Sequence, residues 1–378
     1  MVIVFAGVLT LLLFGLQRIL YRRFWQQGVK VLLRFEKSMV QAGESVILSE
    51  IVENGKWLPL SSLKVKFQCS RNLRFSDDGS SSVTDKFYRN DLFSIMPYRR
   101  ITRSHQISCP KRGYYGIEGI DLVAADLFFS QELMGSMSSD ASLYVIPRAV
   151  SQPELEMAMR RINGELAARR YELEDPFTYR GIREYEPFDD QKAINWKATA
   201  KTGELKVNIR EHTAVNGVRI FMNLTDNSIL RREELLELCI SICSGISGEL
   251  LAQGTHIAIY ANGTDSISGQ QLCLENLADK GSMDTVYKAL ARLKLDGKME
   301  DFRECFQEKL FEDKEGLYTI FVSADRHQDQ QEFLISYGAR RDDFLWICPV
   351  KKREEQEVQA ALTNKTIFVL EESSETVF

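Results

Sequence analysis

The spacing of apolar residues changes once along this 378-residue chain, and that change limits the folds it can adopt. Between residues 31 and 148, apolar and polar residues alternate in short runs, which is the period of half-buried β-strands. After residue 216, short apolar runs are separated by segments whose apolar residues recur every three or four positions, which is the period of helices. The sequence therefore predicts two lobes with different architectures.

The first lobe, residues 31–148, is predicted to be an antiparallel, immunoglobulin-like β-sandwich. Its alternating runs, among them VKVLLRFEKSMV, ESVILSEIVEN and SSLKVKFQCS, are separated by turn clusters such as QAGE and SDDGSSS. Within this lobe, PKRGYYGIEG at 110–119 reads as a hairpin whose glycines supply positive φ angles, or alternatively as a ligand loop.

Residues 149–182 are expected to connect the lobes or, alternatively, to form a flexible loop that binds a partner. A short helix is predicted to begin at Pro153 and to end at Asn163-Gly164, followed by an irregular polar segment. Residues 216–378 then alternate strand and helix, which predicts a doubly wound α/β domain built on a parallel sheet. Ligands of such sheets bind at the carboxyl ends of the strands, where this chain carries 223–228, 261–265 and 323–325.

The first seventeen residues contain no charged side chain and are followed by Arg18, Arg22, Arg23 and Lys30. We interpret residues 1–21 as a transmembrane anchor, because about 20 apolar residues span a bilayer. A cleavable signal peptide is the alternative, but it would carry its charges before the apolar run. Since the cations follow the run, the positive-inside rule predicts a single-pass protein of the cell membrane with cytoplasmic soluble domains.

Charge and motifs exclude several functions. The net charge of −5 and the lack of a basic run argue against binding of nucleic acid. The seven cysteines are scattered without CxxC spacing, so we expect reduced thiols, and the four histidines form no cluster. No phosphate loop, nucleophile elbow or HExxH helix is present, and we predict a protein that is not an enzyme.

The densest stretch of the chain is REYEPFDDQKAINWKATAKTGELKVNIRE, residues 183–211. Its acid pair, Asp189 and Asp190, could act as general acid and base, but no nucleophile accompanies it, and acids in a turn more often cap or pair with cations. We expect Trp196 to be a buried anchor and the segment to serve packing or docking. The predicted signature and docking residues of this 183–215 segment are Arg183, Tyr185, Asp189, Asp190, Lys192, Asn195 and Trp196.

This stretch resembles the signature of the bacterial family known as domain of unknown function fifty-eight, in which the run leads into a sheet of von Willebrand factor type A kind. The positions that fit its pattern are Arg183, Glu184, Tyr185, Pro187, Asp189, Asp190, Lys192, Ile194, Asn195, Trp196, Ala198, Thr199, Ala200, Gly203, Leu205 and Val207. The upstream run KRGYYGIEGIDLVAADLFF resembles a second stretch of the same family, so the likeness extends over most of the chain. Phe188 stands where the family usually has glycine.

The resemblance implies a membrane-anchored protein, often encoded beside a MoxR-type AAA ATPase, with no established enzymatic activity. Type A domains commonly hold Mg²⁺ through Asp-x-Ser-x-Ser, a loop threonine and a later aspartate. Here the first element aligns as Asn223, Thr225 and Asn227, so its carboxylate has become an amide, while Asp325 matches the later aspartate. Ser282 is only an approximate counterpart of the threonine, and Asp226 is a candidate substitute ligand.

We therefore expect an interaction module or scaffold, without a required cofactor, that recruits a MoxR-type AAA ATPase or its client at the membrane. The alternative is a metal-dependent binding or hydrolytic domain that uses the degenerate Mg²⁺ site.

Overall fold

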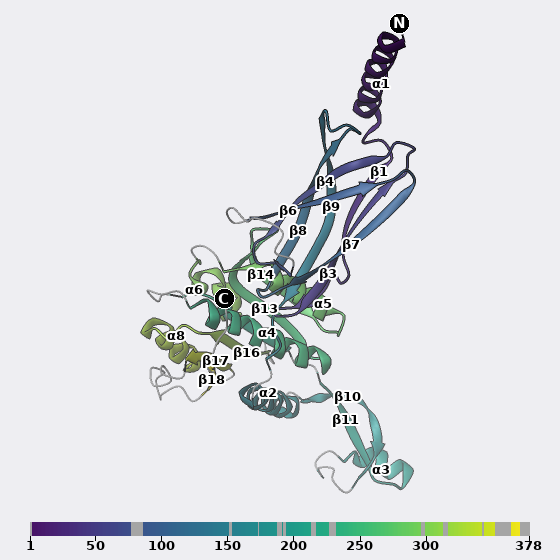
Figure 1. Cartoon of the computed structure of the whole chain (residues 1–378). Coiled ribbons are helices and arrows are strands. Elements are labelled where there is room, and N and C mark those ends of the chain that lie inside the picture. The colour runs from purple at the N-terminus through teal and green to yellow at the C-terminus, as the bar shows by residue number, and fades with distance from the viewer. Residues whose placement is uncertain are drawn as a thin grey trace. The chain divides into compact units, whose positions relative to one another are not determined.

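The computed structural model describes residues 2–76, 86–150, 153–172, 174–186, 191, 194–212, 217–226, 232–295, 299–312, 317–341, 344–351 and 364–370. The chain divides into two compact units, one made of residues 1–148 and 290–292 and the other of residues 149–289 and 293–378 (Figure 1). Its described part is rich in β-structure and begins with an apolar helix.

Helix α1, Val2–Phe24, is three residues longer at its carboxyl end than the predicted anchor. Its segment Ile3–Phe24 is long and apolar enough to cross a membrane, a property it shares with signal sequences. Helix α4, Glu233–Ala252, passes the same test of length and composition, but 72% of its apolar window is buried. We read α4 as a core helix, because its apolar residues pack inside the second unit.

The first unit contains a β-sandwich, as predicted. One sheet has the order β1-β3-β7-β5 and the other the order β2-β9-β8-β4-β6. The strands are β1 Val29–Phe35, β2 Met39–Gln41, β3 Ser45–Asn54, β4 Leu60–Ser70, β5 Arg74–Phe75, β6 Lys86–Ile95, β7 Arg99–Ser108, β8 Gly113–Ala125 and β9 Glu132–Ile146. Inward residues of both sheets form one apolar core. All described pairs are antiparallel except β2 with β9, which is parallel.

The predicted hairpin at 110–119 is wrong, because most of this run lies inside β8. Gly113 is needed for space and not for a positive φ: a Cβ there would lie 2.8 Å from the ring of Tyr115. The Tyr115 hydroxyl donates to the carbonyl of Lys111, 2.9 Å away, which holds the ring across the glycine.

The predicted end of the connecting helix at Asn163-Gly164 is also wrong. Helix α2 runs from Pro153 to Glu172 and is followed by strand β10, Glu174–Glu184, so the segment is not irregular. A glycine within a helix costs only about 1 kcal/mol. Here a stripe of buried residues continues past it and favours the helix: Leu155, Ala158, Met159, Ile162 and Leu166.

The second unit is built on a seven-stranded sheet with the order β14-β13-β12-β16-β17-β18, and β15 pairs with β13. Its strands are β12 Gly217–Asn223, β13 His256–Asp265, β14 Gln271–Leu277, β15 Leu293–Lys294, β16 Leu317–Ser323, β17 Phe344–Lys351 and β18 Lys365–Leu370. Strands β12, β13, β16, β17 and β18 are parallel to their neighbours in this group, whereas β14 and β15 are antiparallel to β13.

Helices α6 Phe302–Cys305, α7 Gln307–Phe311 and α8 Gln328–Gly338 also belong to this unit, as does α5, Ser282–Arg292, except for its last three residues. Helix α4 contacts four of the parallel strands. An aromatic cluster joins α6, α7 and α8 to the sheet, with Phe221 and Phe321 stacked 5.7 Å apart at its centre. Residues 352–363, which belong to the predicted alternation of strand and helix, lie outside the described residues.

Candidate functional site

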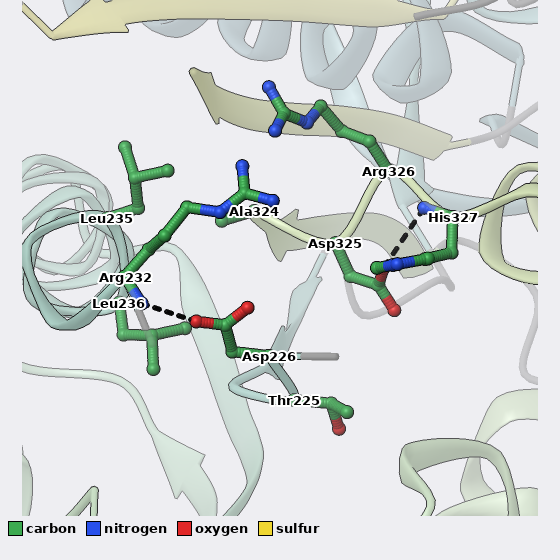
Figure 2. A pocket seen from close by; sticks show the side chains of 9 residues that line it. All are labelled: Thr225, Asp226, Arg232, Leu235, Leu236, Ala324, Asp325, Arg326 and His327. Carbon is green, nitrogen blue, oxygen red and sulfur yellow. Dashed lines mark hydrogen bonds and ion pairs between the residues drawn. The ribbon is translucent and has the colours of Figure 1, made fainter. Parts of the chain in front are cut away.

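A cleft of about 820 Å³ opens at the carboxyl ends of β12 and β16. The chain leaves β12 toward β13 and later returns to β16 on the other side of β12, so the cleft lies where the strand order reverses. Its lining residues are Asn223, Thr225, Met299, Glu300, Asp301, Phe302, Arg303, Glu304, Cys305, Asp325, His327, Asp329 and Gln330. A smaller adjoining hollow of about 100 Å³ shares three of them, Thr225, Asp325 and His327 (Figure 2).

A buried amide on β13 braces this rim. The Asn262 side chain is 1% exposed, and its Oδ1 accepts from the backbone N–H of Leu224, 2.8 Å away. Its Nδ2 donates to Thr225 Oγ1 at 2.9 Å, to the Glu300 carbonyl at 3.0 Å and to Asn223 Oδ1 at 3.2 Å. Sequence reasoning placed Asn262 at a strand end but gave it no role.

These bonds decide how well the rim fits a cation. Asn223 Oδ1 also accepts from the backbone N–H of Thr225, 3.0 Å away, so the predicted amide and hydroxyl oxygens already face N–H donors. Both oxygens are neutral, whereas Mg²⁺ is held in proteins mainly by carboxylates and water. Of the other predicted ligands, Asn227 lies outside the described residues, and only Asp325 offers a carboxylate.

The substitute ligands have other partners. Asp226 accepts the backbone N–H of Arg232 at 2.5 Å, which places its carboxylate at the start of α4 (Figure 2). A carboxylate there is favoured by the exposed N–H groups and the dipole of the helix. Ser282 does not line the cleft, and its hydroxyl donates to Asp279 at the start of α5.

Asp325 and His327 form a close pair on the loop after β16. His327 Nδ1 lies 2.6 Å from Asp325 Oδ1, which also accepts the backbone N–H of His327 (Figure 2). An orienting acid and an imidazole are two parts of a nucleophilic site. The one thiol of the lining is Cys305, and burial raises its pKa, which keeps it protonated and a weak nucleophile.

Acidic side chains dominate the described lining of the cleft. The lining contains one guanidinium, that of Arg303, and five carboxylates: Glu300, Asp301, Glu304, Asp325 and Asp329. Arg303 bonds Asp301 at 2.9 Å and holds the pKa of that carboxyl below its usual range. The remaining negative charge gives the cleft a potential that favours a cationic ligand.

The 183–211 segment folds into a separate hairpin. Strand β10 pairs with β11, Lys206–His212, and with no other strand among the described residues, and helix α3, Trp196–Thr202, lies between them in sequence (Figure 1). Asn195 caps α3 by accepting the Ala198 N–H, 2.9 Å away, and its Nδ2 donates to Asn208. Gly203 ends α3 with φ 76°.

The structure describes four of the seven predicted signature residues, and these four differ in their burial. Arg183 is exposed and Tyr185 is half-buried, with its backbone N–H bonded to the Leu205 carbonyl. Asp189, Asp190 and Lys192 lie outside the described residues.

The expectation of a buried Trp196 is wrong, because its side chain is 68% exposed. No residue of α3 is buried, so the helix has no core on which an indole could rest. Ile182 and Leu205, on the same hairpin, are 53% and 45% exposed. Val207, 4% exposed, is the only buried side chain among those described on this hairpin, and a two-stranded ribbon with so small a core that carries exposed apolar side chains is typical of a contact surface.

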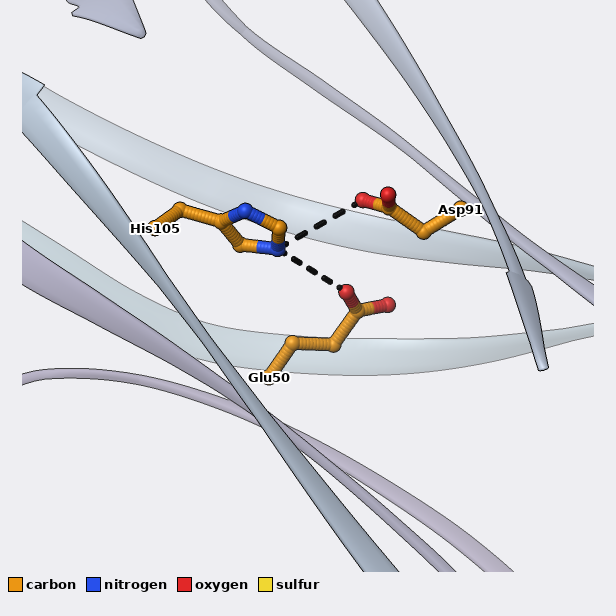
Figure 3. A group of neighbouring side chains, drawn as sticks. All are labelled: Glu50, Asp91 and His105. Atoms are coloured by element: carbon orange, nitrogen blue, oxygen red, sulfur yellow. Dashed lines mark hydrogen bonds and ion pairs between the residues drawn. The ribbon is translucent and has the colours of Figure 1, made fainter. Parts of the chain in front are cut away.

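A second cluster, which sequence reasoning missed, lies inside the sandwich (Figure 3). His105 on β7 lies with its Nε2 3.2 Å from Glu50 Oε2 and 3.5 Å from Asp91 Oδ2, and all three residues are buried. Arg89 Nε donates to Asp91 at 2.7 Å, and the more exposed Arg103 donates to the same carboxylate at 2.9 Å.

The position of Arg89 fixes the tautomer of His105. A guanidinium has only donors, and Arg89 Nη2 lies 3.0 Å from His105 Nδ1, so Nδ1 accepts and the proton lies on Nε2, facing the carboxylates. A metal on Nε2 would displace that proton to Nδ1, against the Arg89 N–H. We therefore interpret Glu50, Asp91 and His105 as a buried ion-pair network and not as a metal centre, although their atoms lie within 4.8 Å of one another.

The cluster predicts a pH dependence of stability. Burial raises the pKa of Glu50 above its ordinary value of 4.5, so above that pH the folded chain holds a proton more tightly than the unfolded chain. The free energy of unfolding therefore falls as pH rises from about 4.5 through the raised pKa. Glu50→Gln removes the titrating group, so the free energy of unfolding of this variant, relative to that of the wild type, should rise with pH. Hydrogen exchange of β3 peptides, corrected for intrinsic rates, measures it; a difference that is constant with pH would contradict the assignment.

Comparisons with known proteins identify no family. No family model matches the chain, and no curated protein matches it. Among solved structures, the CARDB domain of the PF1109 protein from Pyrococcus furiosus is 14% identical over 29% of this chain and 91% of that one, with a TM-score of 0.19. A non-cellulosomal cohesin from Archaeoglobus fulgidus is 11% identical over 34% and 97%, with a TM-score of 0.22.

The sporulation control protein Spo0M from Bacillus subtilis is 15% identical over 42% of this chain and 58% of its own, with a TM-score of 0.19. At these values the likenesses carry no conclusion about function.

Proposed function

We propose that this chain is a membrane-tethered interaction protein that holds a partner protein at the cytoplasmic face of the cell membrane. The apolar helix α1 supports the tether, and the cations that follow it, Arg18, Arg22 and Arg23, favour a cytoplasmic location for both units. Neither the cleft nor the buried cluster combines an activated nucleophile with its base among the described residues, so binding is better supported than catalysis.

The exposed indole of Trp196 is the observation that carries the proposal. Tryptophan is among the residues that most often dominate the binding energy of protein interfaces, and a side chain 68% exposed on a helix without buried residues contributes little to folding. Lys206 stiffens this hairpin by lying 3.1 Å from Glu184 and 3.3 Å from Glu204. Trp196 is thereby displayed on a defined scaffold.

The sequence resemblance suggests the partner. Members of the domain of unknown function fifty-eight family are expected to work with a MoxR-type AAA ATPase, and a type A-like reading of the second unit agrees with its parallel sheet and rim cleft. Because the five carboxylates of the cleft outnumber its single guanidinium, we assign it a basic segment of the ATPase or of a client. The metal-dependent alternative has less support, since Asn262 already donates to two of the oxygens that it needs.

Trp196→Ala should reduce retention of the MoxR-type ATPase or its client by about tenfold or more, because removal of a hot-spot side chain costs at least about 2 kcal/mol of binding free energy. Quantitative co-purification of the full chain from mild-detergent extracts measures this. Tyr88→Ala is the matched control, because Tyr88 is an aromatic residue 48% exposed but lies on strand β6 of the sandwich. Equal retention by both variants, or no retained ATPase or client with the wild type, would refute the proposal.

A further inference from the structure

Three loops lie at the end of the sandwich from which α1 leaves (Figure 1). They are the loops 55–59, 96–98 and 126–131. The first is bonded to α1 by the Tyr21 hydroxyl, which donates to the Pro59 carbonyl at 2.7 Å. The second is joined to the first by Asn54, whose Nδ2 donates to the carbonyls of Leu58 and Met96. These bonds fix the loops relative to the base of the helix.

The loop 126–131 is a tight turn organised by one carboxylate. Asp126 accepts the backbone N–H and the hydroxyl of Ser130 at 2.6 and 2.5 Å, and it also accepts from Gln17 of α1 at 3.0 Å. Phe129 adopts φ 55°, a strained value for a side chain of this size. The turn presents three apolar side chains outward: Leu127, Phe128 and Phe129 are 45%, 64% and 67% exposed.

This turn reaches beside the apolar part of α1. The ring of Phe128 lies 5.7 Å from that of Phe14, which is four residues, or about 6 Å, toward the amino end from Arg18. On the other side of this contact, Arg18 donates to Gln131 and Gln17 to Asp126. If α1 spans a bilayer with Arg18 at its edge, Phe128 lies on the hydrocarbon side of that edge.

The neighbouring loops match a membrane interface. Trp57, Met96 and Tyr98 are 55%, 67% and 71% exposed. Exposed cations accompany them at this end of the sandwich: Arg18, Arg22, Arg23, Arg99 and Arg100. Amphipathic aromatic rings and basic side chains are enriched where proteins meet headgroups, and anionic lipids attract the cations.

We propose that Leu127, Phe128 and Phe129 insert into an anionic bilayer beside α1, with Trp57, Met96 and Tyr98 at the level of the headgroups. The inference rests on the proposed membrane anchor and adds a second attachment to it. A single helix leaves the attached lobe free to tilt, whereas a helix and an adjacent inserted turn hold the sandwich in one orientation toward the membrane.

Spin-label accessibility in nanodiscs of phosphatidylethanolamine and phosphatidylglycerol tests this with the full chain. Cys273→Ser and Cys305→Ser remove the two thiols that are not buried. Nitroxides are then attached in separate variants at Phe128→Cys, at Leu11→Cys on α1 and at Tyr88→Cys. Tyr88 is 48% exposed near the opposite end of β6, so it serves as the water-exposed control. Collision with oxygen reports lipid, and collision with a water-soluble nickel chelate reports water.

The label at Phe128 should match that at Leu11: accessible to oxygen and protected from the chelate, unlike the label at Tyr88. A lipid-exposed Leu11 with a chelate-accessible Phe128 would overturn the inference and leave the anchor intact. Protection of Phe128 from both reagents would also overturn it, because a protein surface would then cover the turn. A chelate-accessible Leu11 would instead refute the membrane anchor itself.

Discussion

Replacing Arg89 with alanine is expected to lower the free energy of unfolding of the sandwich by about 3 to 5 kcal/mol. The guanidinium bonds Asp91 at 2.7 Å and contacts His105 at 3.0 Å, and its removal leaves a buried carboxylate with the partly exposed Arg103 as its remaining guanidinium and His105 Nε2 3.5 Å away. The arginine also lies 4.9 Å from the centre of the Phe75 ring, so a packing contact is lost with the charge. Hydrogen exchange of β6 and β7 peptides in the full chain measures the change where it arises.

Lys64→Ala is the control for this substitution. Lys64 pairs with Glu132 at 3.3 Å in the same sandwich, but the two side chains are 40% and 59% exposed. Water screens such a pair, and its loss should cost no more than about 1 kcal/mol. Similar losses for Arg89→Ala and Lys64→Ala would show that the buried network contributes no more than a surface pair.

Asn262→Ala is expected to destabilise the rim of the second unit by about 2 to 4 kcal/mol, because four hydrogen bonds end on this side chain. The Leu224 N–H and the Glu300 carbonyl would lose a partner that the alanine cannot replace. The ends of β12 and β13 would no longer be joined, so the cleft should lose its shape. Hydrogen exchange of peptides from these strand ends reports the effect.

Gln270→Ala on the exposed turn after β13 provides the comparison, with an expected change within about 0.5 kcal/mol. Asn262→Asp tests the hydrogen bonds apart from the size of the side chain, because aspartate has nearly the same shape as asparagine. It keeps the oxygen that accepts from Leu224 but, when ionised, cannot donate to Asn223 or Thr225. It should also lose rim protection. Full protection in both Asn262 variants would mean that the brace is dispensable.

The alternation of apolar and polar residues predicted the sandwich well, because a strand of a sandwich buries one of its two faces. In β3, buried residues such as Val46, Leu48 and Val52 alternate with exposed or half-buried ones, so the period of two holds throughout. The same method missed β14, Gln271–Leu277, whose burial is irregular and which pairs only at the edge of the sheet. It ended α2 too early because Gly164 lowers helix stability only slightly. Burial of Leu166 by parts of the chain that are distant in sequence stabilises the helix beyond that glycine.

The candidate sites were harder to predict. Glu50 occupies an inward position of β3, so the alternation carried a signal that a charge is buried there. Its partners Asp91 and His105 come from other strands, and no local pattern shows that they meet. Trp196 was misplaced because composition suggested an anchor, whereas burial depends on whether other elements cover α3.

In the proposed function, the hairpin of β10 and β11, with α3 between them, binds a partner protein while α1 holds the chain at the membrane. Photo-crosslinking in intact cells tests this, with a photoreactive phenylalanine analogue at Trp196 and, as the control, at Tyr88, which is 48% exposed on β6. A protein crosslink is expected at Trp196 whose partner, identified by mass spectrometry, is a MoxR-type ATPase or its client, and no such crosslink is expected at Tyr88. A membrane-localised chain that yields no protein crosslink at Trp196 would contradict it.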